Sequence, residues 1–351
     1  MRKEVEVASA LCRRAIAAGL VDRGIEHAKD AVADKPSWSQ AHLYLAQAHF
    51  VRVATVERTI APLKAEDKET NLANALAAAD EAISIADTEG ASYVKAEALA
   101  LKSDIALIQG RKDDAARFAR ESFGADSTEL HGRLAMAQAS FGMGNVDDGI
   151  RILEEAYTCA DSAAQVSFML GQALMERGTE QDFNRAAEVF STANVAHLPG
   201  ELIDPIIIGA IRARVRAKRF SEIPQYLTRP KVAASQVLVA TINAYVARKQ
   251  TLGREAGQFL DSAIALRQPT DTRSVTDFLA RTLMEAGRLS DALPLLQELF
   301  NAQTPNFDVG LLLHCASRLE EDKVILDTCQ ALYERGAHEW DLVEFESQYL
   351  E

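Results

Sequence analysis

The sequence is poor in aromatic residues and in the two residue types that interrupt helices. Aromatic residues make up 6% of the 351 residues, and the chain has only nine prolines and 18 glycines. The low proline and glycine content favours helix over strand and argues against a disordered chain. Because large aromatic anchors are scarce, we expect a core of alanine, leucine, isoleucine and valine, which lets helices approach closely.

The chain also lacks the features of an exported or membrane-spanning protein. Its four cysteines include no C-x-x-C pair and are too few for a disulfide framework at this length, so we expect a reducing compartment. No stretch reaches 18 apolar residues, and the N-terminus carries acidic residues where a secretory signal needs an apolar core. We therefore expect a cytoplasmic protein with no membrane partner.

Basic residues are outnumbered, with 38 against 51 acidic residues and a net charge of −13. This balance opposes non-specific binding to nucleic acid or to an anionic membrane. One region departs from it, because nine basic residues stand against three acidic ones between residues 201 and 250. Five of these basic residues form a cluster at positions 212–219. Nucleic acid is still disfavoured as a partner, since aromatic residues that could stack on bases are scarce beside this cluster.

A repeated pattern of small and apolar residues runs along the chain. In each unit a small or apolar residue is followed at +4 and +7 by two more, so that the three lie on one stripe of a helix. The triplets are Gly24/Ala28/Ala31, Ala75/Ala79/Ala82, Ala115/Ala119/Ser122, Gly149/Leu153/Ala156, Ala186/Phe190/Ala193, Ile223/Leu227/Pro230, Ala256/Leu260/Ala263, Ala292/Leu296/Leu299 and Ile325/Cys329/Leu332. Successive triplets are separated by 51, 40, 34, 37, 37, 33, 36 and 33 residues.

Glycines and a proline mark expected helix ends. A glycine stands five residues before the triplet in four units, where a helix C-terminus needs a left-handed residue; these are Gly19, Gly110, Gly144 and Gly287. In the fifth unit Gly178 stands eight residues before the triplet, which indicates a longer turn. Asp204 followed by Pro205 predicts a helix start, with the aspartate as the cap.

These residues resemble the tetratricopeptide repeat (TPR) family, whose unit of about 34 residues is a pair of antiparallel helices. The best matches are Leu170-Gly171, Leu174, Ala186, Phe190, Ala193 and Pro199 in one unit, and Leu279-Ala280, Leu283, Gly287, Ala292, Leu296 and Pro305 in another. A HEAT-like solenoid or a plain helical bundle would show similar stripes, but HEAT and armadillo units are longer, at about 40–47 residues. The family's first-helix tryptophan is absent. The resemblance implies an all-α, right-handed superhelical solenoid of about nine TPR-like hairpins, forming a single domain over residues 1–351.

Two segments depart from the regular repeat. The first two triplets are separated by 51 residues, which is longer than one regular unit and predicts either an extended hairpin or a loop insertion at residues 51–72. Residues 338–351 are predicted to form the first helix of a further, partial repeat with no second helix to cover it. Such uncapped ends make a homo-oligomer one hypothesis, and a chain cut from a longer protein another.

No catalytic or metal-binding motif is visible. The sequence contains no G-x-x-x-x-G-K-[ST], G-x-G-x-x-G, H-E-x-x-H or G-x-S-x-G pattern. His42 and His49 share a helix face without an acidic or cysteine partner nearby in sequence, so we interpret them as packing or rim residues. We expect no enzyme activity, no cofactor and no metal.

The resemblance also implies a ligand groove, because the first helices of TPR arrays line a concave surface into which their ninth position points. Here that position carries a polar residue in every unit, with further basic residues beside it in the second half of the chain. The candidate groove residues are Arg13, Gln47, Asp104, Gln138, Gln172, Arg212, Arg216, Tyr245, Arg248, Lys249, Arg281, His314 and Arg318. The fifth position is often apolar, as at Leu43, Leu134, Phe168 and Ile208.

We call the series of polar residues at the ninth position of the first helices the polar ladder. Such a ladder beside apolar positions suits an extended peptide or a helix as the ligand. We therefore expect a non-enzymatic scaffold that binds a peptide or helical protein segment, with an acidic segment as the specific hypothesis for the basic half. The alternative is the regulatory or substrate-recruiting arm of a larger enzyme whose catalytic domain lies outside this chain. The carboxylate clamp of chaperone-binding relatives is disfavoured, because Ser9 and Arg13 stand at its first positions and no matching set follows.

Overall fold

The computed structural model describes residues 11–12, 21–57, 65–128, 130–159, 164–193, 195, 200–229, 232, 234–302 and 307–334. The described residues form seventeen helices and no strand, which confirms the all-α fold class. The chain divides into two compact units, the first of residues 1–57 and 63–160 and the second of residues 58–62 and 161–351. None of the helices in the described part combines the length and the apolarity that a bilayer crossing requires.

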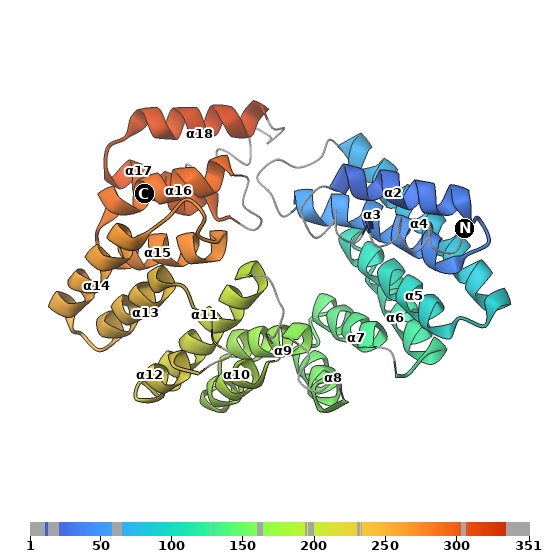
Figure 1. Ribbon diagram of the computed structural model, residues 1–351, viewed down its shortest axis with the longest axis horizontal. Coiled ribbons are helices and arrows are strands. Elements are labelled where there is room, and N and C mark those ends of the chain that lie inside the picture. Colours follow the sequence, from blue (N-terminus) through green and yellow to red (C-terminus); the bar gives the residue numbers. More distant parts are fainter. Residues whose placement is uncertain are drawn as a thin grey trace. The chain divides into compact units, whose positions relative to one another are not determined.

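The first unit is a succession of helical hairpins (Figure 1). Its helices are α2 (Val21–Asp34), α3 (Ser39–Glu57), α4 (Ala65–Glu89), α5 (Ser92–Ile108), α6 (Lys112–Ala125), α7 (Leu130–Gly142) and α8 (Val146–Cys159). Each helix packs against the next along the chain from α2 to α8. The stripes predicted for α2, α4, α6 and α8 are all buried, because small residues on them let the neighbouring first helices approach.

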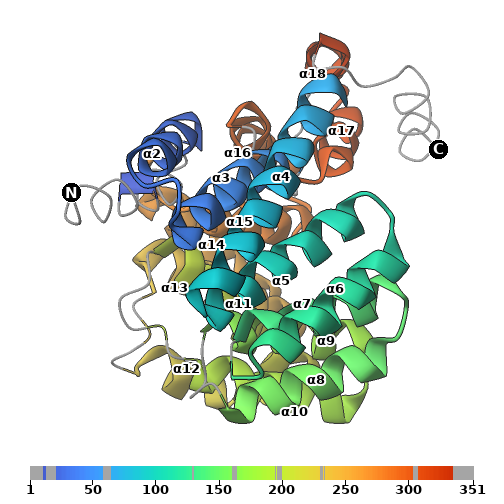
Figure 2. The ribbon, with the colours of Figure 1, turned by 90° about the vertical axis from the view of Figure 1, so that its right-hand side faces the viewer.

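The hairpin of α3 and α4 is the longest in this unit. The two helices have 19 and 25 residues and lie side by side (Figure 2). A buried polar pair joins them, with Nδ1 of His49 2.9 Å from Oδ1 of Asn71. Burial is the main cause that lowers the pKa of His49, so the ring is neutral near pH 7 and donates to the amide oxygen. His42 is buried as well, with its Nε2 2.8 Å from the carbonyl oxygen of Pro36, so both histidines are packing residues as predicted.

The second unit continues the same pattern with ten helices (Figure 1). They are α9 (Ala164–Arg177), α10 (Glu180–Thr192), α11 (Gly200–Arg216), α12 (Glu222–Leu227), α13 (Gln236–Lys249), α14 (Gly253–Leu266), α15 (Arg273–Glu285), α16 (Leu289–Asn301), α17 (Val309–Arg318) and α18 (Asp322–Glu334). The predicted stripes of α10, α14 and α16 are buried. The segment 338–351, for which a partial repeat is predicted, lies outside the described residues.

The sixth repeat differs from its prediction. Its second helix, α12, has only six residues and buries Ile223 and Tyr226, whereas Leu227 is only partly buried. The predicted helix start at Asp204 is wrong, because α11 already begins at Gly200 and contains Pro205 within it. Pro205 is the sixth residue of α11, so the helix lacks the hydrogen bond that an N–H at this position would donate to the carbonyl of Glu201. Asp204 instead accepts a 2.6 Å hydrogen bond from the Thr272 hydroxyl and so joins α11 to the start of α15.

A left-handed residue marks the turn inside most hairpins. Gly110, Gly144 and Gly287 have φ angles of 72°, 83° and 74°, as their spacing predicts. Residues with a side chain take the corresponding place in three other turns; these are Lys218, Thr251 and Glu320, with φ angles of 58°, 63° and 58°. The turn geometry is therefore conserved by the fold even where the sequence carries no glycine.

Candidate ligand cavity

A cavity of about 650 Å³ opens among the first helices of the second unit. Its walls come from α9, α11 and α15, with Phe190 of α10 and Phe307 adding aromatic surface. Phe168 and Ile208, two of the predicted apolar groove positions, line it. The other two, Leu43 and Leu134, belong to the first unit and are buried.

Gln172 and Arg212, from the predicted polar ladder, both line this cavity. The Arg212 guanidinium carbon lies 5.3 Å from the centroid of the Phe278 ring, which is itself 2% exposed. A cation–π contact of this kind favours one position of the guanidinium and leaves its N–H groups available for hydrogen bonds. The Tyr245 ring packs edge-to-face on Phe278 from α13, with the ring centroids 5.4 Å apart. Phe278 therefore links three first helices.

Three other predicted groove residues make polar contacts with residues of α15, and two of these contacts join α13 to α15. Arg248 donates a hydrogen bond to the backbone carbonyl of Glu285, and Nζ of Lys249 lies 2.8 Å from the carboxylate of the same residue. Arg281 pairs with Asp277 one turn earlier on α15, at 2.8 Å. Asp277 lines the cavity, so this pair lies at its edge.

The remaining ladder residues do not line the cavity. Gln47, Asp104 and Gln138 are half-buried on α3, α5 and α7 of the first unit. Arg216 is exposed at the end of α11, with its guanidinium carbon 5.8 Å from the Phe183 ring centroid. His314 and Arg318 lie on α17, and Arg13 lies outside the described residues.

The charges at the cavity are only partly compensated. Neither Arg212 nor Arg273, which also lines the cavity, has an ion pair in the part of the chain that is described. The lining includes two carboxylates, those of Asp277 and Glu176, and Asp277 is occupied by Arg281. Around the cavity, two arginines therefore lack a carboxylate partner of their own.

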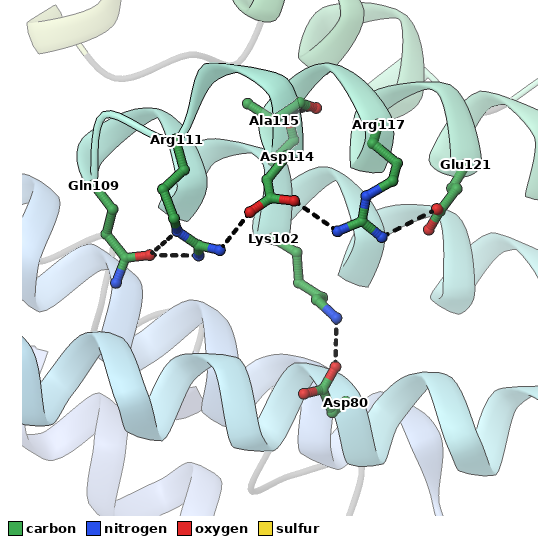
Figure 3. Close-up of polar contacts among 9 residues, drawn as sticks. Asp80, Lys102, Gln109, Arg111, Asp114, Ala115, Arg117 and Glu121 are labelled. Carbon is green, nitrogen blue, oxygen red and sulfur yellow. Dashed lines mark hydrogen bonds and ion pairs between the residues drawn. The ribbon is translucent and has the colours of Figure 1, made fainter.

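Cations of the first unit provide a contrast (Figure 3). There Asp114 bridges Arg111 and Arg117 at 2.8 Å each, and Lys102 reaches Asp80 on α4 at 2.5 Å. The hydrogen bond from Arg117 is the main cause that lowers the pKa of Asp114. Because each of these cations already has an acidic partner, this surface offers less to an anionic ligand than the cavity does.

Phe190 was predicted only as a stripe residue, yet its ring also reaches the cavity. It passes between Gly171 of α9 and Gly209 of α11, and a Cβ atom added to Gly209 would lie 2.7 Å from Cζ of the ring. Two first helices thus lack side chains where the aromatic ring needs space. The glycines in α9 and α11 were the available signal, but sequence alone does not show which ring lies against them.

The repeat is defined by two features of the hairpins. The second helices have buried stripes, and left-handed turns recur 34 residues apart at Gly110, Gly144 and Gly178. The described residues therefore form an array of helical hairpins with a TPR-like fold. No family model matches the chain, and no curated protein sequence matches it. Among the described residues of this TPR-like array, no group of three or more histidine, cysteine or acidic residues could hold a metal ion.

Two solved structures show the extent of similarity to known proteins. The C-terminal part of a TPR repeat-containing protein from Cytophaga hutchinsonii is 15% identical, over 77% of this chain and 99% of that one, with a TM-score of 0.44. Human IFIT1, solved as a dimer with PPP-AAAA, is 14% identical, over 91% of this chain and 69% of that one, with a TM-score of 0.47.

Proposed function

We propose that this protein is a non-enzymatic interaction scaffold that binds a peptide or helical protein segment in the cavity of its second unit. The observation that carries the proposal is the position of Arg212. Its guanidinium lies over the Phe278 ring at the wall of a cavity with both apolar and polar lining, and it has no carboxylate partner in the described part of the chain. A ligand carboxylate would supply the missing partner through charge-assisted hydrogen bonds.

The cavity walls define the rest of the ligand. Phe168, Ile208 and Phe307 provide apolar surface beside the cation. An occupant that places an apolar side chain next to an aspartate or glutamate would bury hydrophobic area and satisfy Arg212 together. We therefore assign an acidic segment with a neighbouring apolar residue as the preferred ligand, and a protein rather than a nucleic acid as its source.

The test is a selection from a library of displayed random peptides on the whole chain, followed by affinity measurement of the enriched sequences. The expected motif combines an acidic residue with a large apolar one. Arg212→Gln should then weaken binding by roughly tenfold or more, because a hydrogen bond to a charged group contributes about 1.5–3 kcal/mol. Charge reversal by Arg212→Glu together with Arg216→Glu should weaken it further.

Arg254→Gln provides the matched control. Arg254 is an exposed arginine in the first turn of α14 that does not line the cavity, so its loss should leave the affinity unchanged. Unchanged far-UV circular dichroism would show that the variants are folded. The proposal fails if the selected peptides carry no acidic residue, or if Arg212→Gln and Arg254→Gln bind them equally well.

A further inference from the structure

A second cavity of the same unit, of about 330 Å³, lies between α10, α11 and α12. Its walls are mostly apolar and include Ala193, Ile206 and Val232, while Tyr226 and Arg229 of the α12 region provide polar groups. Phe190 lines both cavities. The proposed function makes no use of this second cavity.

The polar groups of this cavity have unused hydrogen-bonding capacity. Tyr226 is 3% exposed, and its hydroxyl makes no hydrogen bond in the described part of the chain. Burial raises the pKa of Tyr226 to about 12, so the phenol stays a neutral donor at physiological pH. The guanidinium of Arg229 lies 5.5 Å from the Tyr226 ring centroid, and Arg229 has no ion pair among the described residues. Both groups can therefore bind an anionic acceptor.

A buried arginine adds positive charge directly behind the cavity wall. The Arg214 side chain is 3% exposed and its guanidinium carbon lies 4.4 Å from the Tyr226 ring centroid. It donates a 2.6 Å hydrogen bond to the hydroxyl of Ser191, which is itself a lining residue. Its Nε has no hydrogen-bond partner, and the nearest carboxylate, that of Glu222, is 3.7 Å away.

Glu222 cannot neutralise this region alone. Its carboxylate is bound at 2.6 Å by Arg219, and this hydrogen bond is the main cause that lowers its pKa. Arg214, Arg219 and Arg229 therefore all act on Glu222, and Glu188, which also acts on Arg219, is paired with Arg185. Because Arg214 is buried, its charge is weakly screened and adds to the attraction that the exposed Arg229 has for an anion.

From this arrangement we infer that the cavity between α10, α11 and α12 binds a small monocarboxylic acid with a compact apolar body. The apolar part occupies the space between Ile206 and Val232, and the carboxylate accepts hydrogen bonds from Arg229 and the Tyr226 hydroxyl. A cavity of about 150 Å³ holds benzene, which has six non-hydrogen atoms. The cavity between α10, α11 and α12 has about twice that volume, so it has room for a ligand of about twelve non-hydrogen atoms. This lies at the lower end of the size range of small-molecule sites.

The experiment uses 4-phenylbutyrate as the probe and 4-phenylbutan-1-ol as its uncharged counterpart, with the whole chain in isothermal titration calorimetry. We expect saturable binding of the acid and roughly tenfold weaker binding of the alcohol, because the alcohol lacks the charge-assisted hydrogen bonds. Arg229→Gln should weaken binding of the acid roughly tenfold and leave that of the alcohol nearly unchanged. Tyr226→Phe should weaken the acid less, because it removes one neutral donor.

Two further variants separate this cavity from the first. Val232→Trp should abolish binding of both probes by filling the apolar space, since Val232 is only partly buried and the larger ring can enter without disturbing the core. Arg212→Gln, which changes the first cavity, should have no effect. Absence of saturable binding would overturn the inference, as would equal affinities for wild type and Arg229→Gln. Loss of binding in Arg212→Gln instead of Val232→Trp would place the probe in the first cavity and equally overturn it.

Discussion

The contact of Phe190 with the first helices makes a sharp prediction for Gly209→Ala. An added Cβ would lie 2.7 Å from Cζ and 2.9 Å from Cε1 of the Phe190 ring, well inside the 3.5–4.0 Å of an ordinary carbon contact. The ring is 2% exposed and abuts Gly171 on its other side, so it has little room to move away. Alanine at position 209 should therefore overpack the wall between α9 and α11.

Two opposing terms set the magnitude. Overpacking a core by one methyl group costs about 1–3 kcal/mol. Replacing a helical glycine with alanine gains about 1 kcal/mol from helix propensity. We expect Gly209→Ala to lower the free energy of unfolding by about 1 kcal/mol. Gly257→Ala on α14, where an added Cβ has no atom within 4 Å, should instead raise it by up to about 1 kcal/mol.

Urea unfolding followed by far-UV circular dichroism measures both variants against the wild type. In a Phe190→Leu background the shorter side chain leaves space for the new methyl group, so Gly209→Ala should become stabilising there. A Gly209→Ala variant that stabilises the wild-type chain as much as Gly257→Ala does would refute the reasoning. Such a result would mean that the ring does not occupy the gap between the two helices.

Three further predictions concern single residues. Thr251→Gly should raise the free energy of unfolding by about 1 kcal/mol, because a β-branched residue is strained at a φ of 63° and glycine is not; urea unfolding measures this, and a loss of stability would contradict it. The pKa of Asp182 is lowered to about 2, chiefly by the hydrogen bond from Arg177, so Asp182→Asn should cost about 2 kcal/mol at pH 7. That contribution is present above the unfolded pKa of 3.8 and is lost as pH falls towards 2, so the stability gap between variant and wild type should close over this interval in acid titrations. Burial raises the pKa of Cys315 to about 11, so iodoacetamide at pH 8 should label the exposed Cys159 and leave Cys315 unmodified by mass spectrometry; comparable labelling of the two would disprove the burial of Cys315.

Local signals made the hairpins predictable. Gly110, Gly144 and Gly287 adopt the left-handed turns that their spacing indicates, since no other residue type enters that conformation so readily. The sixth repeat was less predictable, because α12 buries Tyr226 and not Leu227. A helix of only six residues does not repeat its pattern often enough for the sequence to show its phase.

The candidate site was predictable only in part. Gln172 and Arg212 were expected to face a common surface, and both line the first cavity. Arg248 and Lys249 were expected beside them but contact Glu285 on the neighbouring helix. Whether a side chain lies in the groove or contacts the neighbouring helix depends on the distance between the two helices. The spacing of residues within one helix does not determine that distance.

Outside the sixth repeat, the sequence by itself determined the succession of helical hairpins, the left-handed turns at Gly110, Gly144 and Gly287, and the buried stripe of most second helices. These properties follow from helix propensity and from the helical period of 3.6 residues, so they depend on residues that are close together in the sequence. The tertiary structure alone decided that Phe190 fills the space left by Gly171 and Gly209, and that Arg214 is buried beside Tyr226 while Arg212 lines the cavity. The two arginines are alike in sequence, and they differ because residues two apart on a helix point about 200° away from each other and so meet different neighbours.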